Sequence, residues 1–195
     1  MSIPSSSPVP SRPDPEPIHD DPFVTEARGP VRHAAAPTAL GVFTLVADDV
    51  AVTAVHYPGQ DPHPDGGWGS PVHAEDHPVL GPAATQLAEY VSGTRTGFDL
   101  PLRPSGTPFQ REAWAALLAI PYGVTRSYRE QAEALGRPNA VRAVGAANGR
   151  NPIPVVIPCH RVIGSGGALT GYAGGTTLKR ALLDLESGVR RLPTG

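Results

Sequence analysis

Cysteine is nearly absent from this chain: Cys159 is the only one among 195 residues. A single cysteine excludes an internal disulfide and a zinc site built from several thiolates. The chain also lacks an apolar run of transmembrane length, and its N-terminus lacks the basic start and apolar core of a signal peptide. These absences predict a soluble cytoplasmic protein with no membrane association and no structural zinc.

Positive charge is scarce in the first half of the chain. Residues 1–104 carry five arginines against 13 acidic residues, whereas residues 105–195 carry ten arginines and Lys179 against five acidic residues. The formal net charge of −2 therefore hides an acidic first half and a basic second half. This asymmetry indicates a second half that faces a polyanion such as DNA, although chance clustering of solvated charges gives the same pattern.

Large apolar residues are almost absent from residues 1–36, which contain eight prolines. Such a segment cannot bury enough surface to offset its ordering entropy, so we predict a disordered tail over 1–36. Apolar runs over 40–46 and 50–57 predict two strands joined by a hairpin turn, and the pattern over 80–92 predicts a helix. We therefore expect a small α/β domain over residues 37–104.

Three histidines, His63, His73 and His77, lie in the segment 58–78, which is rich in Gly, Pro and Asp. A cluster of histidines could hold a metal ion, but the spacing here is irregular and no thiol is nearby. We expect solvated histidines on a loop.

The second half of the chain has well-marked helix boundaries. Thr107-Pro108-Phe109-Gln110 and Ser127-Tyr128-Arg129-Glu130 are capping boxes, each of which opens a helix. The second of these helices ends at Gly136, and another follows from Pro138. Two short helices joined by such a turn resemble a helix-turn-helix. We also expect Thr176 to cap a final helix.

The chemistry of the chain centres on Cys159 and His160, which follow the apolar run 153–157. A thiolate is the reactive form of cysteine, and a neighbouring base increases its population. The pair therefore indicates a nucleophile with its base. Composition alone favours the alternative, a small buried apolar cysteine.

Over residues 107–186 the chain strongly resembles the methylated-DNA–protein-cysteine methyltransferases, also called O6-alkylguanine-DNA alkyltransferases, and most closely their stand-alone bacterial type. The resemblance rests on several separate motifs, which occur in the order found in the family: Pro108-Phe109-Gln110, Ser127-Tyr128, Arg142-Ala143-Val144-Gly145, Asn151-Pro152, Pro158-Cys159-His160-Arg161-Val162 and Gly171-Tyr172-Ala173-Gly174-Gly175. The resemblance implies a ribonuclease-H-like α/β domain over 37–104. It also implies a mainly α DNA-binding domain over 105–192, with a helix-turn-helix of the winged-helix type.

The resemblance assigns catalytic roles to five residues. Cys159 is implied to accept the alkyl group, His160 to take its proton through a water, and Glu186 to orient that histidine. Asn151 is implied to be a hinge that hydrogen-bonds backbone groups. Tyr128 is implied to help rotate the target nucleotide and to protonate the leaving guanine. Without the resemblance, Glu186 would be interpreted as a surface charge and Asn151 as a turn residue.

The resemblance also implies contacts with double-stranded DNA and with the damaged base. Arg142 is implied to enter the duplex in place of the flipped nucleotide, and the small residues Ala140, Ala143 and Gly145 to let the helix approach the minor groove. The implied walls of the substrate pocket are Pro154, Val162, Tyr172 and Ala173.

The implied activity is DNA repair in a single turnover, in which the alkyl group of O6-alkylguanine, or of O4-alkylthymine, moves irreversibly to Cys159. No metal or organic cofactor is required. We expect a monomer, and the sequence leaves open cooperative assembly on DNA and the range of alkyl groups accepted.

Three other functions compete with this one. A non-catalytic lesion-binding protein would lack the acceptor cysteine. A cysteine hydrolase would use Cys159, His160 and Glu186, but would leave Tyr128 and Arg142 without a role. A transcription regulator that senses alkylation usually needs a further domain, for which residues 1–36 are a poor candidate.

Overall fold

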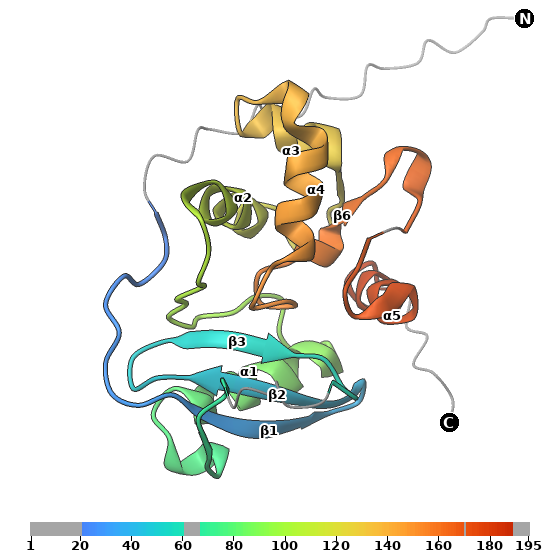
Figure 1. The fold of residues 1–195 in the computed structure, drawn as a ribbon. Helices are drawn as coiled ribbons and strands as arrows, with labels where there is room; N and C mark the ends of the chain where they lie inside the picture. The colour runs from blue at the N-terminus through green and yellow to red at the C-terminus, as the bar shows by residue number, and fades with distance from the viewer. Residues whose placement is uncertain (1–20, 61–66, 170, 189–195) are drawn as a thin grey trace, which may run out of the picture.

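The structure, a computed structural model, describes residues 21–60, 67–169 and 171–188. Within this part the chain forms an α/β N-terminal domain and a mainly helical C-terminal domain (Figure 1). The expected combination of the two fold classes is therefore confirmed. No helix in the described ranges is long and apolar enough to cross a membrane.

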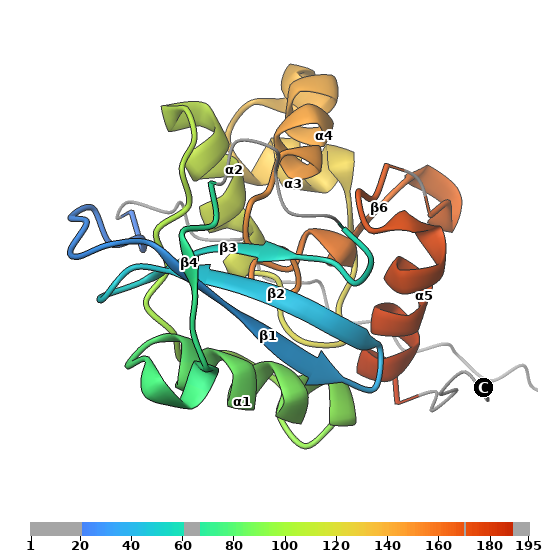
Figure 2. The same cartoon turned by 60° about the horizontal axis from the view of Figure 1, so that its bottom comes forward.

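The N-terminal domain is built on a four-stranded sheet in the order β3-β2-β1-β4. Neighbours β1–β2 and β2–β3 are antiparallel, and β4 runs parallel to β1. The strands are β1 Arg32–Thr38, β2 Gly41–Ala47, β3 Val52–His56 and β4 Ser70–Pro71. Helix α1 (Leu80–Ser92) packs against β1 and β2 and covers one face of the sheet (Figure 2).

The hairpin and the helix predicted for this domain are confirmed. Asp48 forms the β2–β3 turn, where its buried carboxylate accepts hydrogen bonds from the backbone N–H groups of Val50 and Ala51. The bounds of α1 are those expected, with Leu87 and Val91 buried beneath the sheet.

The expected end of the disordered tail at residue 36 is wrong, because β1 already begins at Arg32. The strand was missed because its alanines have low β-propensity, and its stability comes from pairing with β2 along its whole length. Further upstream, Phe23 is buried and the Val24 N–H donates to the Leu102 carbonyl. The N-terminal domain therefore begins before residue 37, and residues 1–20 lie outside the described part.

His77 corrects the expectation of solvated histidines. Its side chain is buried, and Nδ1 accepts hydrogen bonds from the N–H groups of Val79 and Leu80 at 3.2 and 3.3 Å. His77 therefore caps the first turn of α1. His73 is exposed, as expected, and His63 lies outside the described residues. The described ranges contain no cluster of three or more His, Cys, Asp or Glu side chains that could hold a metal ion.

The C-terminal domain contains four α-helices and a small two-stranded parallel sheet in the described ranges. They are α2 Pro108–Leu118, β5 Arg126–Ser127, α3 Tyr128–Ala134, α4 Val141–Gly149, β6 Val162–Ile163 and α5 Gly175–Glu186. Helix α4 packs on both α2 and α3. A single 3-10 turn, Pro138–Ala140, joins α3 to α4 in the expected helix–turn–helix order.

Both capping boxes are present as predicted, at Thr107 with Gln110 and at Ser127 with Glu130. The predicted cap of the last helix is wrong. Helix α5 already begins at Gly175, so Thr176 lies inside its first turn, and Gly174 is the N-cap without a side-chain hydrogen bond.

The two domains are joined along β3, the edge strand nearest the C-terminal helices in Figure 1. The Val52 N–H donates within the N-terminal domain to the Pro101 carbonyl at 2.9 Å, and the Val55 N–H donates across to the Pro152 carbonyl of the C-terminal domain at 2.8 Å. The second bond anchors the start of the segment that leads to Cys159.

Candidate active site

Cys159 opens a 3-10 turn, Cys159–Arg161, at the junction of the two domains. The Asn151 side chain holds both ends of the loop that leads to this turn. Its Nδ2 donates to the Ile157 carbonyl at 2.8 Å and to Cys159 Sγ at 3.2 Å, while its Oδ1 accepts from the Ile153 N–H at 3.0 Å. The amide therefore holds the thiol and the preceding loop in one rigid turn.

Val155, in the middle of this turn, has φ of 72° and is the sole non-glycine residue with positive φ in the described part of the chain. A β-branched side chain is strained there, at a cost of roughly 1–3 kcal/mol. Burial of Val155 and the Ile157 N–H bond to the Ile153 carbonyl hold the turn against this strain. The strained backbone thus lies four residues before the thiol, where it sets the path of the chain into the site.

The thiol itself is buried, and burial raises the pKa of Cys159 to about 11. The hydrogen bond from Asn151 and the positive charge of Lys179 oppose this effect only in part. At neutral pH the group is therefore a thiol, so it needs a base to become a nucleophile.

His160 is the base nearest in sequence, and its ring is completely buried. Its Nε2 lies 2.5 Å from Glu186 Oε1. Since an ionised carboxylate can only accept, Nε2 carries the hydrogen and Nδ1 of the neutral ring is left as an acceptor. Nδ1 is buried and has no hydrogen-bond partner among the described residues. Burial lowers the pKa of His160 although Glu186 opposes the shift, which favours this neutral form at neutral pH.

Glu186 accepts hydrogen bonds at both carboxylate oxygens. Oε1 accepts from His160 and from the Tyr90 hydroxyl, while Oε2 accepts from Arg161 Nε at 2.8 Å and the Gly123 N–H at 3.0 Å. Burial raises the pKa of this carboxyl, but these donors and the Arg161 charge outweigh burial and bring it to about 2. Glu186 is therefore a buried, ionised and fully bonded carboxylate.

Tyr128 and Arg142 lie on the two helices of the helix–turn–helix. Tyr128 is half-buried at the start of α3, between α4 and the glycine-rich loop: a Cβ built at Gly145 would lie 3.8 Å from its ring, and one at Gly171 3.5 Å from its hydroxyl. Burial raises its pKa. Arg142 is exposed on α4 and makes no ion pair within the described residues. Ala143 beside it is exposed, and Ala140, the N-cap of α4, is half-buried.

Of the four expected pocket residues, Pro154 lies in the loop that precedes the thiol, and Val162 directly follows the 3-10 turn that begins at Cys159. Pro154 and Val162 are buried, and Tyr172 is half-buried with its hydroxyl enclosed. Ala173 is exposed. Tyr57 from the N-terminal domain packs edge-on against Tyr172, with ring centroids 5.4 Å apart.

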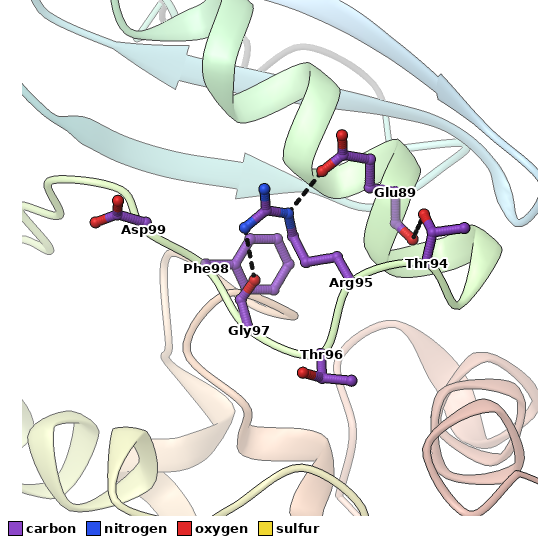
Figure 3. A pocket seen from close by; sticks show the side chains of 7 residues that line it. All are labelled: Glu89, Thr94, Arg95, Thr96, Gly97, Phe98 and Asp99. Atoms are coloured by element: carbon purple, nitrogen blue, oxygen red, sulfur yellow. Dashed lines mark hydrogen bonds and ion pairs between the residues drawn. The ribbon is translucent and has the colours of Figure 1, made fainter.

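A separate hollow of about 650 Å³ lies at the end of α1 (Figure 3). It is lined by Glu89, Thr94, Arg95, Thr96, Gly97, Phe98 and Asp99. Part of its polar lining is bonded internally, since Arg95 Nε donates to Glu89 Oε2 at 2.7 Å and the Thr94 hydroxyl donates to the Glu89 carbonyl. None of the predicted site residues lines this hollow.

Comparison with known proteins agrees with this geometry. Residues 108–188 match the family model of the 6-O-methylguanine DNA methyltransferase DNA-binding domain. The methylated-DNA–protein-cysteine methyltransferase of Mycolicibacterium paratuberculosis is 45% identical over 157 residues, which cover 80% of this chain and 92% of that protein. The chain belongs to the methylated-DNA–protein-cysteine methyltransferase family.

Two further relatives show how far the likeness extends. The methyltransferase of Methanosarcina barkeri is 60% identical over 104 residues, but the match spans 53% of this chain and 66% of that protein. The crystal structure of Mycobacterium tuberculosis OGT in complex with DNA is similar with a TM-score of 0.71 and 42% identity, covering 80% of this chain and 93% of that one. The family predicted from the sequence motifs is confirmed.

In this member of the family, sequence reasoning missed the role of Arg161 and Lys179 in the site. Arg161 is buried, and besides Glu186 it bonds the Ile120 carbonyl through Nη1 at 2.6 Å. Lys179 is also buried, and its Nζ donates to the Val162 carbonyl at 2.6 Å. A usable pattern existed for Lys179: it is the single lysine, two helical turns before Glu186 on the same face of α5.

Proposed function

We propose that this protein repairs DNA by moving the alkyl group of O6-alkylguanine irreversibly to Cys159, once per molecule. The proposal is supported by two hydrogen bonds at the site, one from Asn151 to the buried thiol of Cys159 and one from buried His160 to Glu186. Together these residues supply a thiol, a ring nitrogen with no partner among the described residues and a fixed carboxylate. Family membership directs this chemistry to alkylated DNA.

The proposed reaction begins when Cys159 loses its proton to His160 Nδ1 through a water molecule. The sulfur then attacks the alkyl carbon, so that an S–C bond forms and the C–O6 bond breaks. Tyr128 supplies a proton to the departing guanine. The tyrosine then regains a proton from the His160 imidazolium or from solvent. Thiol and alkylated base give thioether and guanine, a balance that requires no metal or organic cofactor.

Access to the alkyl carbon requires that the nucleotide leave the base stack. We assign Arg142 to the space that the nucleotide vacates. The small residues Ala140, Ala143 and Gly145 would let α4 approach the minor groove closely. Pro154, Val162, Tyr172 and Ala173 would then form the pocket for the flipped base.

Several finer properties belong to the same proposal. O4-alkylthymine is a second substrate with an equivalent alkyl–oxygen bond. The N-terminal domain is of the ribonuclease-H-like type, and the helix–turn–helix is of the winged-helix type. The protein acts in the cytoplasm as a monomer.

A titration tests the proposed stoichiometry. A fixed amount of protein is mixed with increasing duplex oligonucleotide that contains one O6-methylguanine, and the repaired lesion is counted. We expect a plateau at one equivalent for the wild type and no repair by Cys159→Ala. Repair beyond one equivalent would contradict a single-turnover protein and favour a hydrolase.

Arg142→Ala separates DNA engagement from chemistry. Arg142 is exposed on α4 and is proposed to act on the DNA duplex, without taking part in the reaction at Cys159. We therefore expect the variant to repair duplex DNA far more slowly and to react with free O6-methylguanine at the wild-type rate. Arg180→Ala, which changes an exposed arginine on α5, serves as the matched control. Equal losses on both substrates would refute the role of Arg142.

A further inference from the structure

The N-terminal domain reaches the proposed catalytic carboxylate through Tyr90. This tyrosine lies on α1, 96 residues before Glu186, and its side chain is completely buried. Its hydroxyl donates a hydrogen bond to Glu186 Oε1, the same oxygen that accepts from His160 Nε2. Two donors from different domains therefore share one carboxylate oxygen.

The direction of the Tyr90 hydroxyl is fixed by its surroundings. The ring packs against Phe98 with centroids 4.8 Å apart and meets Tyr122 edge-on at 5.8 Å. Phe98 lies in the loop that follows α1 (Figure 3), so this loop packs against the Tyr90 ring. The hydroxyl also accepts a bond from Arg161 Nη2 at 3.3 Å, which leaves it one direction in which to donate.

We propose that Tyr90 is a positioning residue that sets the basicity of His160 through Glu186. The inference rests on the proposed roles of Cys159, His160 and Glu186. An oxygen that already accepts a strong hydrogen bond is a weaker acceptor for a second donor. Tyr90 therefore limits how strongly Glu186 stabilises the imidazolium form, and it keeps His160 neutral and ready to accept the thiol proton.

The other charged and titratable groups around this pair act at different atoms. At Glu186, Arg161 and the Gly123 N–H occupy Oε2, and the Tyr122 hydroxyl is directed to the Leu185 carbonyl. The positive charges of Arg161 and Lys179 disfavour protonation of His160. Among the described residues, Tyr90 is thus the single donor that competes with His160 for Oε1.

The test is the pH dependence of the single-turnover repair rate in Tyr90→Phe. Loss of the hydroxyl should raise the pKa of His160, so the acid limb of the profile should move to higher pH by roughly one unit or less. The rate should fall several-fold on the acid limb, whereas at pH 7, where His160 is already neutral, it should change far less. A profile that superimposes on the wild type would overturn the inference, even if the melting temperature falls.

Tyr122→Phe is the matched control, because it removes a neighbouring hydroxyl that does not bond Glu186. Its acid limb should stay at the wild-type position. An equal shift in Tyr122→Phe would overturn the assignment to Tyr90, since any lost hydroxyl would then have the same effect.

Glu186→Gln distinguishes failure of this inference from failure of the proposed function. In the Glu186→Gln background, Tyr90→Phe should cause no additional shift of the acid limb. If Glu186→Gln is slow and the Tyr90→Phe profile is unchanged, only the role of Tyr90 is refuted. If Glu186→Gln repairs DNA at the wild-type rate, the proposed role of the carboxylate fails as well.

Discussion

Glu186→Ala is expected to lower the free energy of unfolding by about 3–5 kcal/mol, the cost of leaving a buried charge without its partner. The reason is Arg161, which is only 7% exposed and loses the carboxylate that neutralises it. Tyr90 and the Gly123 N–H lose their acceptor at the same time. Urea unfolding at neutral pH measures the effect.

The matched control for stability is Glu133→Ala, which removes an exposed carboxylate from α3. We expect it to change the free energy of unfolding by less than about 0.5 kcal/mol. If both variants are equally stable, the buried network around Glu186 does not hold the two domains together as described.

The stabilisation from Glu186 should also depend on pH in a defined direction. Its pKa is lowered in the folded protein to about 2, below the ordinary glutamate value of about 4.3. The contribution is therefore complete above the ordinary value and is lost as the pH falls toward 2. The difference in stability between wild type and Glu186→Ala should shrink over this acid range.

His160→Gln is expected to slow repair about 10²–10⁴-fold at neutral pH, the usual contribution of a general base. Glutamine can still donate to Glu186, so the buried network stays bonded, but no ring nitrogen remains to accept the proton of Cys159. Because the pKa of this thiol is about 11, the thiolate is scarce at pH 7 without a base. Single-turnover repair of an O6-methylguanine duplex measures the loss.

The pH profile makes this prediction specific. The rate of His160→Gln should keep rising with pH as the thiol approaches its own pKa, whereas the wild-type rate should become level once His160 is neutral. His73→Ala, which changes an exposed histidine, should behave as the wild type. A His160→Gln variant with the wild-type rate at pH 7 would remove His160 from the mechanism.

Local features of the fold could be predicted because their causes are local. The bounds of α1 follow from its apolar spacing, and both capping boxes follow from residues three positions apart. Strand β1 could not be predicted, because its stability depends on pairing with β2 rather than on its own alanines. The cap by His77 was missed for a related reason, since no rule for N-caps places a histidine three residues before a helix.

The site was predictable to the extent that it lies in one motif. Cys159 and His160 are adjacent in sequence, and the resemblance added Asn151 and Glu186. The roles of Arg161 and Tyr90 depend on contacts that join α1, α5 and the 3-10 turn, which are far apart along the chain. Such pairings are decided by tertiary packing, and a single sequence carries no pattern for them.

The central claim is that Cys159 takes the alkyl group and keeps it. We would measure the intact mass of the protein, and then of its peptides, after incubation with a duplex that contains one O6-methylguanine. The account predicts one methyl group in place of one hydrogen, on the peptide that carries Cys159, and no change in Cys159→Ala. An unchanged wild-type mass despite removal of the lesion would contradict the account.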